Sequence, residues 1–144
     1  MAIEDTLARV ELFADLRPED LARVAKLTLV RQYKTGDVIV RENEAGVAFY
    51  VIASGKVELV KGLGTSSEQI VGDMGPEDFF GEMALFDNQV RSLSVRAAQD
   101  TECLVLTKWD FNAELSSGNC SIAIALLAVL ARRIRALNEA AASH

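Results

Sequence analysis

The sequence predicts a mainly β protein: a β-roll or jelly roll with a helix pair before it and a long helix after it. Three observations lead to this prediction. Apolar residues recur at helical spacing before residue 28, short β-branched and aromatic runs separated by turn residues follow, and a long apolar helical pattern begins near residue 121. We expect one domain over residues 1–144, with a helical N-terminus (1–27), a β-roll (28–107) and closing helices (108–144).

The N-terminal part is predicted to form two helices. The second begins at Pro18, which suits a first helical position, and acidic residues in its first turn favour the positive end of the helix dipole. The first helix carries apolar residues at helical spacing, namely Ile3, Leu7, Val10 and Phe13.

The middle of the chain is predicted to be all β. Short apolar runs alternate with turns that contain Gly, Asn or Asp, as in residues 35–37, 42–46 and 54–55. The candidate strands are 29–33, 37–41, 48–53, 56–61, 69–74, 92–97 and 101–106. Strands of this length and number suit a sandwich or jelly roll.

The C-terminal part is predicted to hold a short helix over 108–115 and a long helix over 121–142, capped by Ser121. We expect Trp109 to pack the short helix against the β-roll. The apolar stripe of the long helix is broad and rich in Ala, so a second helix can approach it closely. This predicts a homodimer formed through the C-terminal helix.

Composition and charge exclude several classes of protein. The net charge of −6 argues against direct nucleic-acid binding, which normally needs a basic face. The apolar run 122–131 is too short to span a membrane, and the N-terminus lacks the features of a secretory signal, so we expect a cytoplasmic protein without membrane insertion. The only histidine is His144, which leaves no material for a His-based metal site or a Ser-His-Asp triad. We expect a binding protein and no enzyme.

The stretch Phe80–Leu85, followed by Arg91–Val95, carries the chemistry of a ligand site. Gly81 predicts a turn, and a short helical turn near Glu82 would direct the unpaired N–H groups of Met83, Ala84 and Leu85 toward an anion. Arg91 adds a charge-assisted hydrogen bond to the same anion. Glu82 can accept a hydrogen bond from a sugar hydroxyl. Taken alone, Arg91 could also be a surface residue paired with Glu82, and the run of Arg132, Arg133 and Arg135 is interpreted as a solvated helix face.

The order of these features resembles the cyclic nucleotide-binding domain family. The most specific part is the phosphate-binding cassette over residues 80–95, and the upstream segment Phe49–Val57 is similar to the strand-turn-strand pattern of the family. The resemblance implies a ligand that is a cyclic purine nucleotide, cAMP as the first candidate and cGMP as the second, with no further cofactor. It implies a sensor that couples occupancy to its C-terminal helix.

The resemblance also assigns site residues. The cassette residues expected to surround the ligand are Phe80, Gly81, Glu82, Met83, Ala84, Leu85, Arg91, Ser92 and Leu93. By similarity of Ala131-Arg132-Arg133 to the bacterial members, Leu137 would cover the purine and Asn138 would hydrogen-bond its edge. The Ser92 hydroxyl can reach a phosphate oxygen or a guanine amino group, so it does not choose between the two nucleotides.

Two departures from the family leave alternatives open. Leu93 stands where a small residue is common, and it either crowds the pocket or packs on the other face of its strand; Val90 replaces a frequent Pro. The alternatives to a sensor are a ligand-free dimerising scaffold, the sensor half of a transcription regulator without its DNA-binding domain, and a cupin-like metalloenzyme, which the single His disfavours.

Overall fold

The computed structural model describes residues 3–86 and 90–142. Its elements follow the predicted order of helices, strands and helices. The helical segments, in which η denotes a 3-10 helix, are α1 (Ile3–Ala8), η1 (Glu11–Phe13), α2 (Pro18–Leu27), η2 (Glu82–Leu85), α3 (Lys108–Ser116) and α4 (Ser121–Ala142). The strands are β1 (Leu29–Tyr33), β2 (Val38–Val40), β3 (Ala48–Ser54), β4 (Val57–Lys61), β5 (Gln69–Met74), β6 (Phe79–Phe80), β7 (Ser94–Ala97) and β8 (Thr101–Thr107).

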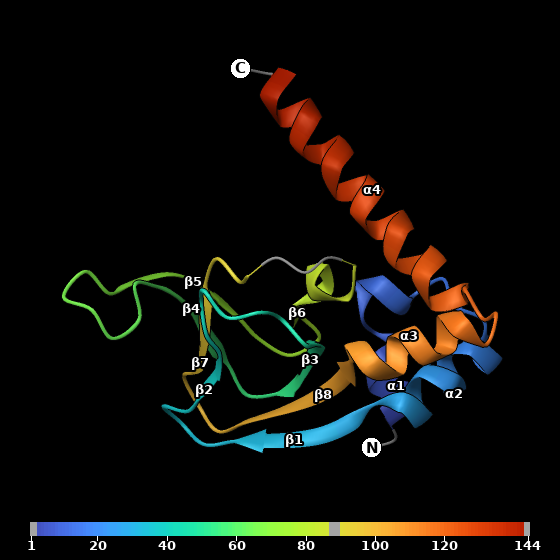
Figure 1. Ribbon diagram of the computed structural model, residues 1–144, viewed down its shortest axis with the longest axis horizontal. Helices are drawn as coiled ribbons and strands as arrows, with labels where there is room; N and C mark the ends of the chain where they lie inside the picture. Colours follow the sequence, from blue (N-terminus) through green and yellow to red (C-terminus); the bar gives the residue numbers. More distant parts are fainter. Residues whose placement is uncertain (1–2, 87–89, 143–144) are drawn as a thin grey trace.

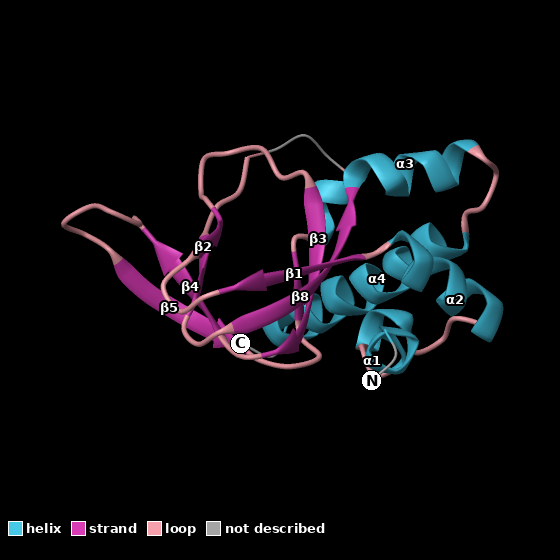
Figure 2. Ribbon diagram, turned by 90° about the horizontal axis from the view of Figure 1, so that it is seen from below, coloured by secondary structure: helices cyan, strands magenta, loops and turns pink. Residues whose placement is uncertain are grey.

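The strands form two four-stranded antiparallel sheets, with the orders β1-β8-β3-β6 and β2-β7-β4-β5. The helices gather at one end of the molecule, and the β4–β5 hairpin lies at the other (Figure 2). This arrangement confirms the predicted β-roll with flanking helices.

Strand β3 lies at the centre of the molecule and is buried on both faces. Phe49 and Val51 point into one apolar cluster, which the helices cover, while Tyr50 and Ile52 point into a second cluster that reaches the other sheet. Alternate residues of a strand face opposite sides, so one short segment serves both cores. The first sheet is therefore packed between the helical layer and the second sheet.

The helical layer is tied to the sheet by large apolar side chains. Phe13 contacts Phe49 in an edge-to-face arrangement with ring centroids 5.9 Å apart, and Phe111 of α3 is fully buried in the same cluster. The Thr107 hydroxyl caps α3 by accepting a hydrogen bond from the Asp110 N–H at 3.1 Å. The prediction that Trp109 packs against the β-roll is wrong, because its side chain is 80% exposed and Phe111 occupies the buried position.

Three local predictions differ from the structure. The first helix ends at Ala8 and continues as the separate turn η1. The predicted strand over 92–97 begins at Ser94, and β6 has only two residues, too few to show a period in the sequence. Ser121 is the first residue of α4 and not its cap, and its own N–H donates to the Asn119 side-chain oxygen at 3.2 Å.

Helix α4 is buried only in its first half. Ile122, Leu126 and Val129 pack into the core, whereas residues 131–142 are exposed throughout. The second half of α4 extends away from the remainder of the chain to the C-terminus (Figure 1). Among the described residues, no helix combines the length and apolar character needed to cross a bilayer.

Candidate ligand-binding site

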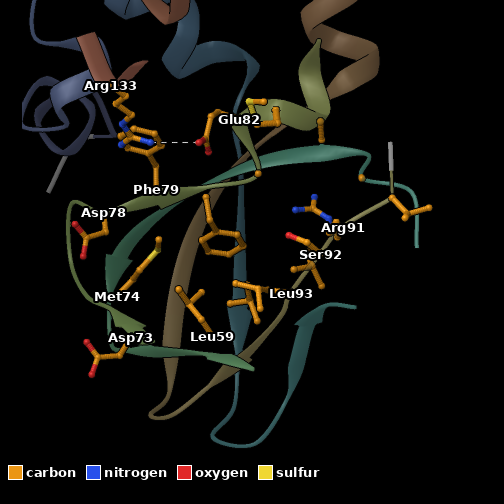
Figure 3. Close-up of a pocket in the computed structure, with 18 of the residues that line it drawn as sticks. Leu59, Asp73, Met74, Asp78, Phe79, Glu82, Arg91, Ser92, Leu93 and Arg133 are labelled. Atoms are coloured by element: carbon orange, nitrogen blue, oxygen red, sulfur yellow. Dashed lines mark hydrogen bonds and ion pairs between the residues drawn. The ribbon is translucent and has the colours of Figure 1, made fainter. Parts of the chain in front are cut away.

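The cassette faces a pocket of about 630 Å³, within the range of about 300–1,000 Å³ that is usual for small-molecule sites. Strand β6, the turn η2 and the segment before β7 form its walls, together with side chains from β2, β4, β5 and α4 (Figure 3). The predicted site residues that line it are Phe80, Gly81, Glu82, Met83, Ala84, Arg91, Ser92 and Leu93.

Gly81 makes the turn between β6 and η2 possible. Its φ is +85°, in the left-handed region, and a Cβ at this position would lie 2.7 Å from the Ala48 carbonyl oxygen. Both the backbone conformation and the close approach exclude other residues here. The turn predicted near Glu82 therefore forms where it was expected.

Only some residues of η2 face the pocket. Leu85 is buried in the core beneath the turn and does not line the pocket, which corrects its predicted place among the ligand contacts. The N–H of Ala84 donates to the Gly81 carbonyl at 3.1 Å, so the prediction of a free donor at Ala84 is wrong. Met83 is largely exposed at the rim.

Arg91 is a half-buried cation. Its Nη2 donates to the Ala48 carbonyl at 3.0 Å, and its guanidinium lies 5.9 Å from the centroid of the Tyr50 ring. Among the described residues, no carboxylate forms an ion pair with it. Burial lowers the pKa of Arg91, while nearby Tyr50 and Glu82 act in the opposite direction. A guanidinium stays protonated in proteins, so the pocket contains a desolvated positive charge whose described hydrogen-bond partner is a neutral carbonyl.

The residues after Arg91 continue along the wall of the pocket. Ser92 is exposed to the pocket, and Leu93 lines it together with Leu59 (Figure 3). Of the two alternatives for Leu93, the structure shows a side chain in the pocket and not one on the opposite face of a strand. The pocket has its volume of about 630 Å³ with the Leu93 side chain in place, so this side chain does not fill the pocket.

Helix α4 reaches the pocket through Arg133. Its Nη1 lies 3.3 Å from the Glu82 carboxylate, and its guanidinium lies 4.5 Å from the centroid of the Phe79 ring (Figure 3). Arg133 is solvent-exposed, as interpreted, but it also pairs with Glu82 at the rim of the pocket. The alternative pairing of Glu82 with Arg91 does not occur. One arginine among the three of this helical run carries no sequence signal for a partner 51 positions away.

Leu137 and Asn138 are not brought to the pocket wall. Both lie in the exposed second half of α4, beyond Arg133, and neither lines the pocket. Leu137 is 70% exposed. Contacts of these two residues with a purine remain a prediction.

The pocket is polarised. Arg91 and Ser92 lie at one end, and Asp73 and Asp78 lie at the other (Figure 3). Glu77 lines this acidic end and accepts a hydrogen bond from Arg9 Nε at 2.7 Å. An anionic group is therefore favoured at the Arg91 end, because Arg133, the other cation that lines the pocket, is already paired with Glu82. No group of three or more potential metal ligands occurs among residues 3–86 and 90–142.

Comparisons with known sequences agree with this geometry. The profile of the cyclic nucleotide-binding domain matches residues 30–117. The cyclic AMP receptor protein of Thermus thermophilus is 38% identical over 124 residues, which cover 86% of this chain and 57% of that protein. A cGMP-dependent protein kinase of Drosophila melanogaster is 33% identical over 116 residues, covering 78% of this chain and 12% of the kinase.

Solved structures give the same answer. The N-terminal domain of a transcriptional regulator from Streptomyces coelicolor A3(2) matches with a TM-score of 0.82 and 32% identity, over 94% of this chain and 96% of that one. The catabolite activator protein of Thermus thermophilus matches with a TM-score of 0.76 and 36% identity, over 89% of this chain and 60% of that one. The chain spans less than two thirds of the two curated relatives described above. On the strength of the profile, the relatives and the shared fold, this chain belongs to the cyclic nucleotide-binding domain family.

Proposed function

We propose that the chain binds a cyclic purine nucleotide, cAMP before cGMP, in the pocket between the cassette and α4. The observation that carries this proposal is the half-buried Arg91 guanidinium, which has no carboxylate partner among the described residues and shares its pocket with Glu82. A buried cation of this kind favours an anionic ligand, because the ligand restores the interactions that the cation lost on leaving water. The proposed role is binding, without turnover of the nucleotide.

The polarity of the pocket sets the orientation of the ligand. The cyclic phosphate lies at Arg91 and accepts a second hydrogen bond from the Ser92 hydroxyl. The ribose 2′-hydroxyl donates to Glu82, and the purine lies along the apolar wall that includes Leu59 and Leu93. The acidic end remains free of phosphate.

The ion pair between Glu82 and Arg133 is the proposed coupling element. It ties α4 to the cassette, with 3.3 Å between Arg133 Nη1 and Glu82 Oε1. A ribose hydroxyl that donates to Glu82 competes with Arg133 for this carboxylate. The free energy of ligand binding therefore differs between an arrangement of α4 that keeps the ion pair and one that breaks it. Such a difference shifts the population of the two arrangements.

We also propose that α4 forms a homodimer with a second copy. Four apolar side chains of α4, each more than half exposed, lack a covering surface in the single chain: Ile124, Leu127, Ile134 and Leu137. Leu127 and Ile134 are seven residues apart and share one side of the helix, as in a coiled-coil seam. The names of the relatives, a receptor protein and a transcriptional regulator, support a sensory role within a regulatory protein.

Isothermal titration of the chain with cAMP and with cGMP tests the proposal. We expect saturable heat with at least one nucleotide and a rise in melting temperature. Absence of both at millimolar nucleotide would contradict the proposal and favour the ligand-free dimerising scaffold. With 2′-deoxy-cAMP we expect binding weaker by about 10- to 150-fold, the equivalent of about 1.5–3 kcal/mol for one lost hydrogen bond to a charged carboxylate. In the Glu82→Ala variant this discrimination should disappear.

A further inference from the structure

Residues 42–46, which the sequence presents only as a turn, lie beside Arg91 in the structure. We infer that Gly46 is a positioning residue for Arg91: the missing side chain at this position fixes where the guanidinium lies and thereby sets the affinity for the phosphate of the ligand. The inference rests on the proposed function, because its consequence for affinity requires a ligand phosphate at Arg91.

The backbone of Arg91 is anchored to this segment. The Arg91 N–H donates to the Glu44 carbonyl at 2.9 Å, and the Asn43 N–H donates to the Arg91 carbonyl at 2.8 Å. Three residues after Arg91, the fully buried Ser94 hydroxyl accepts a hydrogen bond from the Glu42 N–H at 2.9 Å. The main chain at Arg91 therefore has little freedom to move away from Gly46.

The guanidinium lies against the open side of Gly46. A Cβ placed at Gly46 would lie 3.2 Å from both Cζ and Nη2 of Arg91, and 2.6 Å from the Cβ of Ala84. The first distance is shorter than ordinary van der Waals contact, and the second is shorter than real Cβ contacts allow. One added methyl group would thus push on the guanidinium and on the turn η2 at the same time.

The backbone conformation does not explain a glycine at this position. The glycines with positive φ include Gly81 but not Gly46. Alanine can therefore adopt the backbone of residue 46, and the contacts with Ala84 and Arg91 oppose it. Gly81 is a poorer probe, because its substitution also strains a left-handed backbone and meets the Ala48 carbonyl.

The test compares Gly46→Ala with Gly75→Ala, a matched control whose added Cβ has no atom within 4 Å and whose φ is not positive. We expect Gly46→Ala to weaken cAMP binding about tenfold or more, the effect of losing a well-aligned hydrogen bond from a charged group. In the unliganded protein, the NMR signal of the Arg91 side-chain Nε–H group, assigned with Arg91→Lys, should shift in Gly46→Ala. Gly75→Ala should change neither quantity.

The NMR arm separates the two proposals. A native chain that binds neither nucleotide would overturn the proposed function, and a shifted Arg91 signal in Gly46→Ala would still support the positioning role. Native affinity together with an unshifted Arg91 signal in Gly46→Ala would overturn the inference.

A second pair of variants keeps the test decisive if Gly46→Ala does not fold. Gly46→Ala combined with Ala84→Gly removes the 2.6 Å contact and retains the 3.2 Å contacts with Arg91. We expect the double variant to bind cAMP several-fold more weakly than Ala84→Gly alone and to show the shifted Arg91 signal. Equal affinity and equal spectra for these two proteins would also overturn the inference.

Discussion

Replacement of Arg91 by alanine should separate binding from stability. The Arg91 guanidinium contacts the carbonyl of Ala48 and the ring of Tyr50, and no ion pair with a described carboxylate is lost when it is removed. Hydrogen bonds that involve a charged group contribute about 1.5–3 kcal/mol each. Loss of one such bond to the phosphate lowers the affinity by about 1.5–3 kcal/mol, or about 10- to 150-fold, and loss of two lowers it by up to about 6 kcal/mol.

The stability of the unliganded protein should respond differently. Removal of a half-buried charge relieves its desolvation cost, which offsets the lost hydrogen bond to Ala48. We expect the free energy of unfolding, measured by urea denaturation, to stay within about 1 kcal/mol of the native value or to rise. Arg31→Ala, at an exposed position on β1, is the control and should leave both quantities unchanged.

Two results would refute this reasoning. Native affinity in Arg91→Ala would show that the phosphate does not lie at this residue. A loss of several kcal/mol of stability would show that Arg91 is a structural residue, because removal of a charge that serves ligand binding should not unfold the protein.

Other predictions concern the Asp100 carboxylate, the two cysteines and the dimer. The Asp100 carboxylate accepts two hydrogen bonds from Thr35, at 2.9 and 3.0 Å, which lower its pKa below the ordinary 3.8. Asp100→Asn should therefore be less stable than the native chain at pH 7, and this difference should vanish as the pH falls from 3.8 through the lower folded-state pKa; a pH-independent difference would contradict the assignment. Burial raises the pKa of the Cys103 thiol to about 12, whereas Cys120 is exposed, so a thiol reagent should label one cysteine in the native protein and both after unfolding. Ile134→Asp should convert the dimer to a monomer in light scattering, and a native chain that is already monomeric would contradict the dimer proposal.

The main elements of the fold could be predicted because they carry local signals. The period change near residue 28 marks the start of the β-roll, and Pro18 marks the start of α2. Strand β6 could not be predicted in this way, because its two residues are defined by pairing with Tyr50 and Val51 and not by a repeat of their own.

The residues of the site also differ in whether local sequence signals predict them. Gly81 and Glu82 were predicted from adjacent residues, since the turn that they form is local. The tie between Glu82 and Arg133 depends on how α4 docks, and the role of Gly46 depends on two side chains far along the chain. Neither the ion pair nor the role of Gly46 can be predicted from residue spacing or composition. The predicted purine contacts in α4 rest on a three-residue similarity, and the structure brings Arg133 to the pocket in their place.

A crystal structure of the chain in complex with cAMP most directly tests the central claim, that a cyclic nucleotide binds with its phosphate at Arg91. We predict electron density for the nucleotide in the pocket between β6 and α4, with a phosphate oxygen about 2.7–2.9 Å from the Arg91 guanidinium and the ribose 2′-hydroxyl at hydrogen-bond distance from Glu82. Nucleotide bound elsewhere on the chain, or bound in this pocket with its phosphate at the acidic end beside Asp73 and Asp78, would contradict the account.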